Sequence, residues 1–253
     1  MLFSPSLVSF FILVASSVTA RNAHTRRGSS GGAHSVDFGT FASSGQSVDD
    51  FLWKRGYMTS AYTIATDVFG SVARRFDKSN VKIEDGLLKL KVNGFTGGAV
   101  VSSEIESISN FKYGTMTAKA TAVEGVCQGI FFYHSTQQEI DIELLSSYYT
   151  KGYKQIVLPG AQYTNQPAYE KAPKSAKARI MPFDPTTGFH NWTPDATRFY
   201  LDGVLQWRLT QNVPQVGSKI ILNNWSNGDP NWSAGPPKKD AYLLVKSLSY
   251  TPL

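Results

Sequence analysis

The clearest pattern in the chain is a short alternation of hydrophobic and polar positions that recurs along most of its length. Five segments show it: 81–92, 113–123, 197–209, 219–225 and 242–251. Side chains of a β-strand point alternately to its two faces, so each segment is expected to form a strand or hairpin with one buried face. An Asp-Gly pair divides the first and third segments, which is typical of a tight hairpin turn. Long amphipathic helical stretches are missing, so the chain is predicted to be an all-β sandwich or barrel.

One alternating segment differs from the others because its polar positions are all acidic. In the stretch QQEIDIELL, Glu139, Asp141 and Glu143 alternate with Ile140 and Ile142. If this is a strand, the three carboxylates share one face and the two isoleucines lie on the other. Like charges held this close repel one another. The acidic face is therefore either an ordinary solvent-facing edge or a site that uses carboxylates for chemistry.

Paired carboxylates are the usual means of cleaving a glycosidic bond. One is ionised and attacks the anomeric carbon, and the other carries a proton for the leaving oxygen. Retention of configuration requires the two groups to lie ~5–5.5 Å apart, whereas residues four apart on a flat strand are separated by ~13 Å. A hydrolase therefore requires a sheet that is concave at this strand.

The composition limits the number of domains and the kinds of partner. The chain has 253 residues, of which 42% are hydrophobic, enough for one large core. Its composition is uniform from Asp37 onward, so residues 37–253 are interpreted as one domain. The net charge is +6, but residues 1–36 hold three arginines and no acidic residue, which leaves 22 basic and 19 acidic residues in the domain. This mild excess, without a basic stripe, argues against nucleic acid as a partner.

The N-terminus predicts export from the cell. Residues 1–20 contain an apolar run from Leu7 to Ala15 and end in small residues at Ala20, as in a secretory signal peptide. A membrane anchor is the alternative, but the run is shorter than the ~20 residues that span a bilayer. The expected location is secreted, extracellular or in the cell wall, with no membrane association after signal removal. Residues 21–36 are rich in Gly, Ser and Arg and are expected to be a flexible lead-in.

Four motifs occur in a fixed order along the chain. They are the segment 97–133, the acidic strand EIDIELL, the segment FHNWTPDATRFYLDGVL (189–205) and the segment KIILNNWSNGDPNW (219–232). Together they resemble glycoside hydrolase family 16, the secreted β-glucanases, over about residues 80–250. The stretches SSYYT and YTNQP resemble the fungal type of this family.

The resemblance implies a fold, an activity and roles for individual residues. The fold would be a jelly-roll sandwich of two antiparallel curved sheets with a concave substrate cleft. The activity would be endo-acting, retaining hydrolysis of β-glucan at β-1,3 and/or β-1,3-1,4 linkages. Glu139 matches the nucleophile, Asp141 the assisting acid and Glu143 the general acid/base. The residues that match the sugar-binding positions are Phe131, Tyr133, Gln166, Asn223 and Trp225.

The chain departs from the family pattern at three places. Gln137 stands where many members have a Trp two residues before the nucleophile. Lys246 stands where calcium-binding members have an Asp, and because a cationic side chain does not ligate calcium, no bound metal is expected. No cofactor is expected either. About four residues are missing between His190 and Trp192, which shortens an expected strand.

Two other functions fit the same residues. A transglycosylase that remodels cell-wall glucan would share the covalent intermediate and differ only in the acceptor. A non-catalytic, lectin-like glucan-binding protein would share the sandwich, and the shortened segment favours it. Of three Asn-Trp-Ser/Thr sequons, those at Asn191 and Asn224 fall in expected strands, which leaves Asn231 as the glycosylation candidate. The lone Cys127 allows no internal disulfide and is expected to be a buried thiol in a monomer.

Overall fold

The computed structural model describes residues 32–66, 70–112, 114–121, 126–145, 160–169, 172–181, 188–195, 198–229, 232–233 and 235–252. The expected signal peptide and Asn231 lie outside these described residues. Strands dominate, and the described part contains one α-helix, α1 (Val48–Lys54), and two 3-10 helices, Phe38–Thr40 and Lys78–Asn80. Within the same residues, no helix combines the length and the apolar character needed to cross a membrane.

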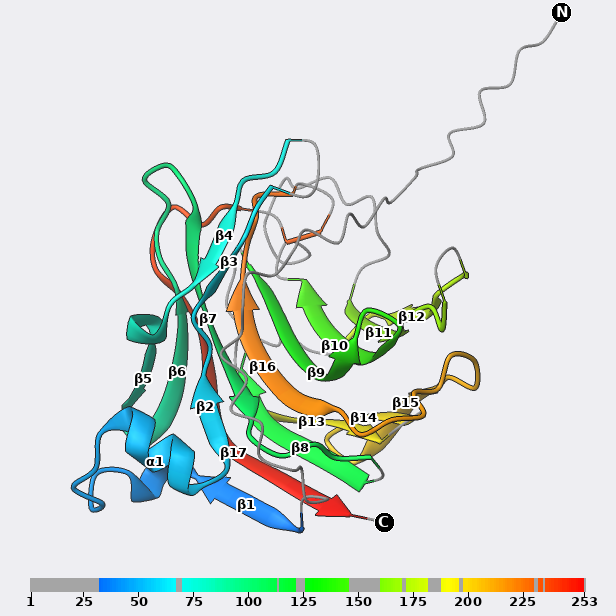
Figure 1. The fold of residues 1–253 in the computed structure, drawn as a ribbon, viewed down its shortest axis with the longest axis horizontal. Coiled ribbons are helices and arrows are strands. Elements are labelled where there is room, and N and C mark those ends of the chain that lie inside the picture. The colour runs from blue at the N-terminus through cyan, green and yellow to red at the C-terminus, as the bar shows by residue number, and fades with distance from the viewer. Residues whose placement is uncertain are drawn as a thin grey trace, which may run out of the picture.

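The outer sheet contains eight of the described strands (Figure 1). They run in the order β15-β14-β13-β8-β17-β6-β5, and β1 also pairs with β17. The strands are β1 (His34–Asp37), β5 (Val81–Glu84), β6 (Leu87–Val92), β8 (Gly114–Thr121), β13 (His190–Asp195), β14 (Arg198–Leu201), β15 (Val204–Arg208) and β17 (Ala241–Pro252).

The concave sheet contains nine described strands in the order β12-β11-β10-β9-β16-β7-β4-β3, with β2 paired to β7. The strands are β2 (Tyr57–Thr59), β3 (Tyr62–Ile64), β4 (Arg74–Phe76), β7 (Val100–Ser107), β9 (Cys127–Ser135), β10 (Gln138–Leu145), β11 (Ala161–Asn165), β12 (Ser175–Arg179) and β16 (Lys219–Trp225). Figure 1 shows β9, β10 and β16 bending together, so that the sheet is hollowed on the side away from the outer sheet. One pair, β4 with β7, is parallel, which departs from the expected fully antiparallel sheets.

The hairpin turns form where the Asp-Gly pairs predict them. Asp85 and Gly86 join β5 to β6 with φ values of 55° and 73°, and Asp202 and Gly203 join β14 to β15 with φ values of 50° and 78°. Positive φ at both central residues is the property of the turn whose twist matches paired strands. The strand predictions for these two segments are confirmed.

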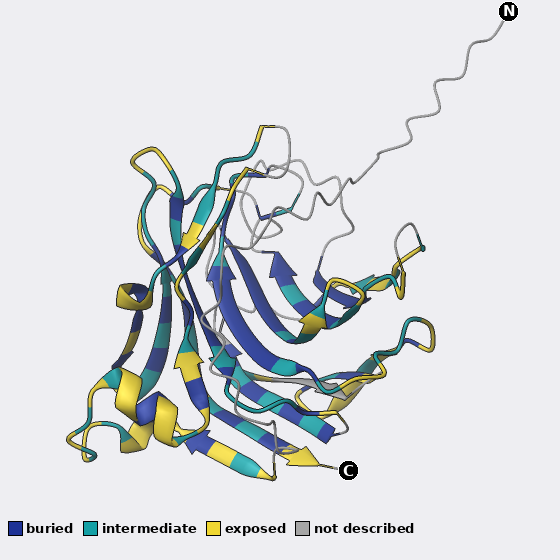
Figure 2. Ribbon diagram, in the orientation of Figure 1, coloured by how far each residue is buried: buried dark blue, intermediate teal, exposed yellow. Residues whose placement is uncertain are grey.

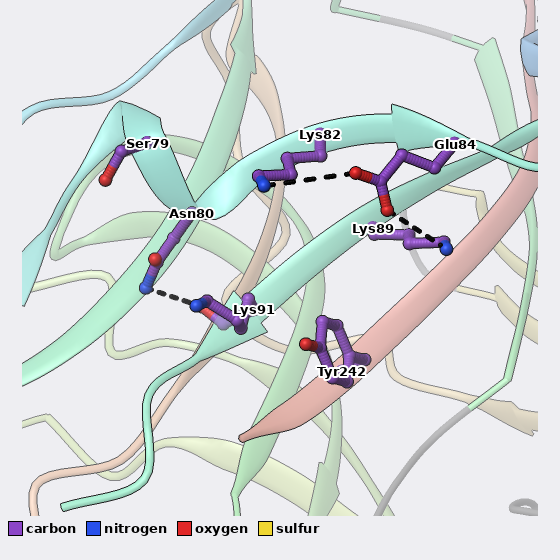
Figure 3. Close-up of a pocket in the computed structure, with 7 residues that line it drawn as sticks. All are labelled: Ser79, Asn80, Lys82, Glu84, Lys89, Lys91 and Tyr242. Atoms are coloured by element: carbon purple, nitrogen blue, oxygen red, sulfur yellow. Dashed lines mark hydrogen bonds and ion pairs between the residues drawn. The ribbon is translucent and has the colours of Figure 1, made fainter.

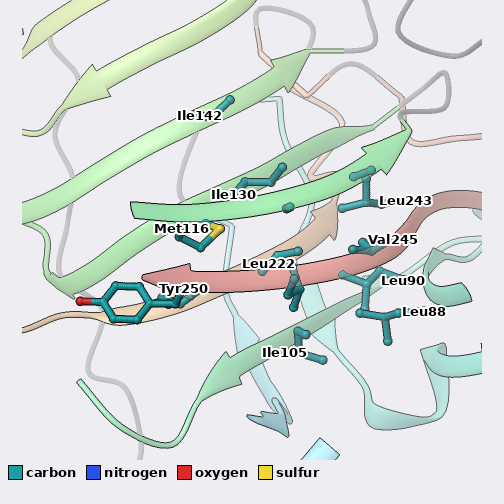
Figure 4. Close-up of a cluster of buried hydrophobic side chains, with 14 of the residues drawn as sticks. Leu88, Leu90, Ile105, Met116, Ile130, Ile142, Leu222, Leu243, Val245 and Tyr250 are labelled. Atoms are coloured by element: carbon teal, nitrogen blue, oxygen red, sulfur yellow. The ribbon is translucent and has the colours of Figure 1, made fainter. Parts of the chain in front are cut away.

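The hydrophobic core lies between the two sheets (Figure 2). Ile130, Ile142 and Leu222 from the concave sheet and Leu90 and Leu243 from the outer sheet are all fully buried within it (Figure 4). Each such side chain contributes about 1.5–3 kcal/mol by leaving water. The alternation in the sequence therefore identifies the buried face of β6, β10 and β17 correctly, whereas the apolar Val204, Leu205 and Trp207 of β15 are exposed.

The first described strand starts earlier than the sequence predicts. His34–Asp37 pairs with β17, and Val36 is 1% exposed in the core. The imidazole Nε2 of His34 also lies 2.9 Å from the hydroxyl of Tyr57. The prediction of a flexible lead-in is therefore wrong for residues 34–36. They form a strand because Val36 is buried in the core and this part of β17 has an edge open for pairing. Helix α1 was also missed, although Ser47 caps it by accepting a hydrogen bond from the Asp50 amide.

The shortened segment still forms a strand of the outer sheet. β13 pairs with β8 over only three residues, His190–Trp192, and with β14 over Trp192–Asp195. Asp202 accepts a hydrogen bond from the Asn191 amide at 2.8 Å, and its other oxygen lies 2.8 Å from Nδ1 of His190. The sheet is therefore continuous here, and the missing residues shorten the strand without removing it.

Candidate active site

The three acidic residues of β10 occupy one face of the concave sheet. From Ile140 to Leu144 the strand pairs without interruption with β9 on one side and β11 on the other. Ile140 and Ile142 are buried in the core, so Glu139, Asp141 and Glu143 point to the opposite, hollowed side. The only register shift in this pairing falls between Gln138 and Glu139, before the acidic stretch. The predicted face, and the absence of a bulge between Glu139 and Glu143, are confirmed.

A row of residues crosses the concave sheet from Glu143. Successive strands pair Glu143 with Gly129, Gly129 with Asn223, and Asn223 with Glu104. A Cβ atom at Gly129 would lie 2.5 Å from Oδ1 of Asn223. Glycine is therefore required there, because any side chain would collide with the amide that lies beside it.

Glu104 is a fourth carboxylate of this face that the sequence analysis did not identify. It is 2% exposed and accepts hydrogen bonds from the Tyr62 hydroxyl at 3.2 Å and from Nδ2 of Asn223 at 3.2 Å. Burial disfavours the ionised form and raises the pKa of Glu104 to about 7. A signal was present, since Glu104 and Glu106 flank Ile105 in the same acidic alternation as β10.

Glu139 and Asp141 form a hydrogen-bonded pair of carboxyl groups. Burial raises the pKa of Glu139 and of Asp141, the latter to about 7, and the repulsion between the β10 carboxylates adds to this. Asp141 also accepts a hydrogen bond from Nε2 of Gln166 at 2.8 Å. Two carboxyl groups that interact this strongly titrate as a pair, and each disfavours the ionised form of the other.

Glu143 has a different environment from the other two acids. Its Oε1 accepts hydrogen bonds from the indole Nε1 of Trp232 at 3.0 Å and from the Cys127 thiol at 3.3 Å. Burial raises its pKa, and these two donors and the positive charges of Lys174 and Arg74 oppose that rise. Environments that differ between neighbouring carboxyl groups are what an acid and a nucleophile require.

The predicted sugar-binding residues surround the acids on the same face. Phe131 lies opposite Asp141, and Tyr133 lies opposite Glu139, both partly exposed. Trp225 is also partly exposed, with the Arg74 guanidinium carbon 4.7 Å from the centre of its ring. With Gln166 and Asn223 already placed above, the structure brings all five predicted residues to the acidic face.

The sequence of residues 71–241 matches the family model described as "Glycosyl hydrolases family 16", and this match covers more than half of the chain. The chain belongs to glycosyl hydrolase family 16.

Similar proteins agree with this assignment. Beta-glucanases of Paenibacillus polymyxa and Acetivibrio thermocellus are 31% and 30% identical to the family 16 chain over 160 and 172 residues. The matches cover 58% and 61% of this chain, but only 63% and 47% of those relatives. Among solved structures, the Bacillus licheniformis beta-glucanase superposes with a TM-score of 0.67 at 18% identity, over 89% of this chain and all of the other. The laminarinase catalytic domain of Thermotoga maritima gives 0.57 at 16% identity, over 71% and 83%. The predicted jelly-roll sandwich is confirmed.

Two departures of this family 16 chain concern surface positions. Gln137 lies exposed in the turn between β9 and β10, so no aromatic ring extends the acidic face at that point. Lys246 is exposed on β17, at a register shift in the pairing with β8. In the part of the chain that the structure describes, no group of three or more His, Cys, Asp or Glu side chains could hold a metal ion.

A shallow hollow of the family 16 domain lies elsewhere, on the outer sheet (Figure 3). Its lysines have acidic neighbours: Lys89 contacts Glu84 at 3.2 Å and Asp85 at 2.7 Å, and Lys91 contacts Asp240 at 3.1 Å. The lysines of the hollow are thus paired with carboxylates, which neutralise their charge. The acidic face, which holds several like charges out of solvent, is the candidate active site.

Proposed function

We propose that this chain is an endo-acting hydrolase that cleaves β-glucan, at β-1,3 and/or β-1,3-1,4 linkages, with retention of the anomeric configuration. The observation that carries the proposal is the acidic face of β10, where Glu139 and Asp141 lie beside each other with raised pKa values while Glu143 accepts hydrogen bonds from donors of its own. The names of the relatives, beta-glucanase and laminarinase, support the substrate class.

In the first chemical step, Glu139 attacks the anomeric carbon while Glu143 protonates the glycosidic oxygen that leaves. Glu139 attacks as the carboxylate, so the proton of the Glu139–Asp141 pair resides on Asp141 in this step, and Gln166 donates to Oδ2 of Asp141. In the second step, ionised Glu143 takes a proton from water, whose oxygen displaces Glu139 from the sugar. Two inversions at one carbon give a product with the original β configuration.

The surrounding side chains would bind the sugar chain. The rings of Phe131, Tyr133 and Trp225 offer flat surfaces for the C–H faces of pyranose rings. Asn223 is buried beside these rings and donates to Glu104, so it holds that carboxyl group at the acidic face. On this proposal the chain acts as a secreted monomer, outside the cell or in the cell wall, after loss of residues 1–20.

Product analysis with laminarin, lichenan and xyloglucan tests the proposal, with NMR of the anomeric proton during the reaction. Short oligosaccharides with an initial β anomer from laminarin or lichenan are expected. An initial α anomer would show that the roles of Glu139 and Glu143 are wrong. Products longer than the substrate would indicate a transglycosylase. Binding without cleavage, unaffected by removal of the three acids, would indicate a lectin-like protein.

A further inference from the structure

Two side chains from distant parts of the sequence donate to the same oxygen of Glu143. Trp232 follows β16 and Cys127 begins β9, yet both contact Oε1, at 3.0 Å and 3.3 Å. We infer that Trp232 and Cys127 are positioning residues that lock Glu143 through Oε1 and so leave Oε2 as the oxygen that carries the transferable proton. This inference rests on the proposed function, in which Glu143 is the general acid/base.

The turn that carries Trp232 is held by buried polar contacts. The Ser233 hydroxyl donates to the side-chain Oδ1 of Asn227 at 2.9 Å, and the backbone N–H of Asn227 donates to the Ser233 hydroxyl at 3.2 Å. The amide of Trp232 donates to the carbonyl of Asp229 at 3.2 Å. Ser233 is fully buried and Asn227 is 3% exposed. A turn with its polar groups satisfied internally presents the indole N–H in one direction.

Cys127 reaches Glu143 because Gly129, which lies between them, has no side chain. Glu143 pairs directly with Gly129, and Cys127 is two positions further along β9 on the same face. Diagonal neighbours of this kind are within reach when no side chain intervenes. The thiol is fully buried, and burial raises its pKa well above the ordinary value, so the sulfur keeps its proton. It is therefore a hydrogen-bond donor in the working range of the enzyme.

Several charged and titratable groups surround Glu143, and the two donors lower its pKa together with Lys174 and Arg74. Facing the acidic side are Glu139 and Asp141 on β10, Cys127 on β9, Glu104 on β7, Lys174 before β12 and Arg74 on β4. Lys174 also lies over the Trp232 ring, with Nζ 5.3 Å from its centre. A cation there draws electron density from the indole and strengthens its N–H as a donor.

Two donors on one oxygen restrict where the proton of Glu143 sits. When the carboxyl group is neutral, Oε1 must remain the acceptor, because a proton on it would face the N–H of Trp232. The proton therefore occupies Oε2, and the carboxyl group cannot rotate to exchange the two oxygens without breaking both bonds. When the group is ionised, both donors stabilise its charge. Loss of either donor should loosen the group and raise its pKa.

Four variants test the positioning of Glu143: Trp232→Phe removes the N–H, Cys127→Val removes the S–H, and Cys127→Ser keeps a donor. Trp207→Phe makes the same ring change on β15 of the outer sheet and serves as the control. The carboxyl carbon of Glu143, assigned with Glu143→Gln, is titrated by NMR in each protein. Trp232→Phe and Cys127→Val should raise its pKa by about 0.5–1 unit. Cys127→Ser and Trp207→Phe should leave it near the wild-type value.

Kinetics give a second readout. General acid catalysis supplies about 10²–10⁴-fold, so poor positioning in Trp232→Phe should lower kcat on laminarin about tenfold, and less on an aryl oligosaccharide with a good leaving group. The basic limb of the kcat/KM profile should move to higher pH. An unchanged Glu143 titration in both donor-deleting variants, or equal losses on both substrates, would overturn the inference. If the wild-type protein cleaves no glucan, the proposed function fails, while the titration still decides whether the two residues hold Glu143.

Discussion

Strand β10 and the hairpin β5–β6 share one sequence pattern and differ in what it produces. Both alternate charged and apolar residues, and both bury the apolar ones. On β5–β6 the charges have opposite signs and lie near solvent, as with Lys82 and Glu84 at 3.9 Å, whose side chains are 59% and 51% exposed. On β10 the charges have one sign, and Asp141 is 3% exposed. Alternation thus predicts a strand. Whether its polar face is a candidate active site is indicated by the sign of its charges and by how far they are buried.

The largest difference should appear on deletion of one carboxylate from each region. Glu139→Ala should reduce turnover of laminarin or lichenan about 10³-fold or more, because the nucleophile is lost. Azide should restore part of the activity and yield an α-glycosyl azide, since only one inversion then occurs. Glu84→Ala, the matched control, should change turnover less than about twofold. Equal effects of the two substitutions would end the distinction between the regions.

The next difference concerns the pH dependence of stability. The pKa of Glu104 is about 7 in the folded protein, above its ordinary value of 4.5. The folded state therefore binds the proton more tightly than the unfolded state, and stability is lost as the pH rises from about 4 through 7. The loss from Glu104 should be about 3 kcal/mol. Glu104→Gln should remove that part of the slope in urea unfolding at pH 4 to 8. Glu84→Gln should leave the slope as it is, and a slope unchanged by Glu104→Gln would show that Glu104 is ionised throughout.

Local patterns predicted the strands of the alternating segments and the β10 acids, whereas the convergence of distant segments was not predictable. The turns at Asp85 and Asp202 and the buried Ile142 depend on neighbours along the chain. Glu104 and Trp232 meet the β10 acids only because β16 lies between β9 and β7, an order that no local pattern encodes. The parallel pairing of β4 with β7 and the early start at β1 depend likewise on which sheet edges remain open.

A smaller effect, on glucan binding, is expected when uncharged aromatic residues of the two sheets are compared. Trp225→Ala should weaken glucan binding by about 1–3 kcal/mol if its ring is a platform for a sugar. Trp207, 37% exposed on β15, is the matched position on the outer sheet. Its replacement by Ala should leave binding unchanged in calorimetric titrations with laminarin oligosaccharides. Unchanged binding in Trp225→Ala, with a lower melting temperature, would show that this ring only packs.

The smallest effect should come from the paired surface charges themselves. Lys89→Met removes contacts with Glu84 and Asp85 at the β5–β6 turn. Exposed ion pairs contribute about 0.2–1 kcal/mol, and salt screens them. The stability change in urea unfolding should stay within that range and shrink in high salt. A loss of several kcal/mol would mean that this hairpin is as dependent on its charges as the acidic face.

The pairing of β1 with β17 determines when the fold can be completed. β17 lies between β8 and β6 and also pairs with β1, so the last of the described strands in chain order is an interior strand of the outer sheet. Until it has been synthesised, β6 and β8 have open edges and the core has no second wall over them. Contacts between strands so far apart in sequence form slowly, on a scale of milliseconds to seconds. The outer sheet therefore closes only when β17 has joined β6, β8 and β1, which makes this pairing a late step of folding.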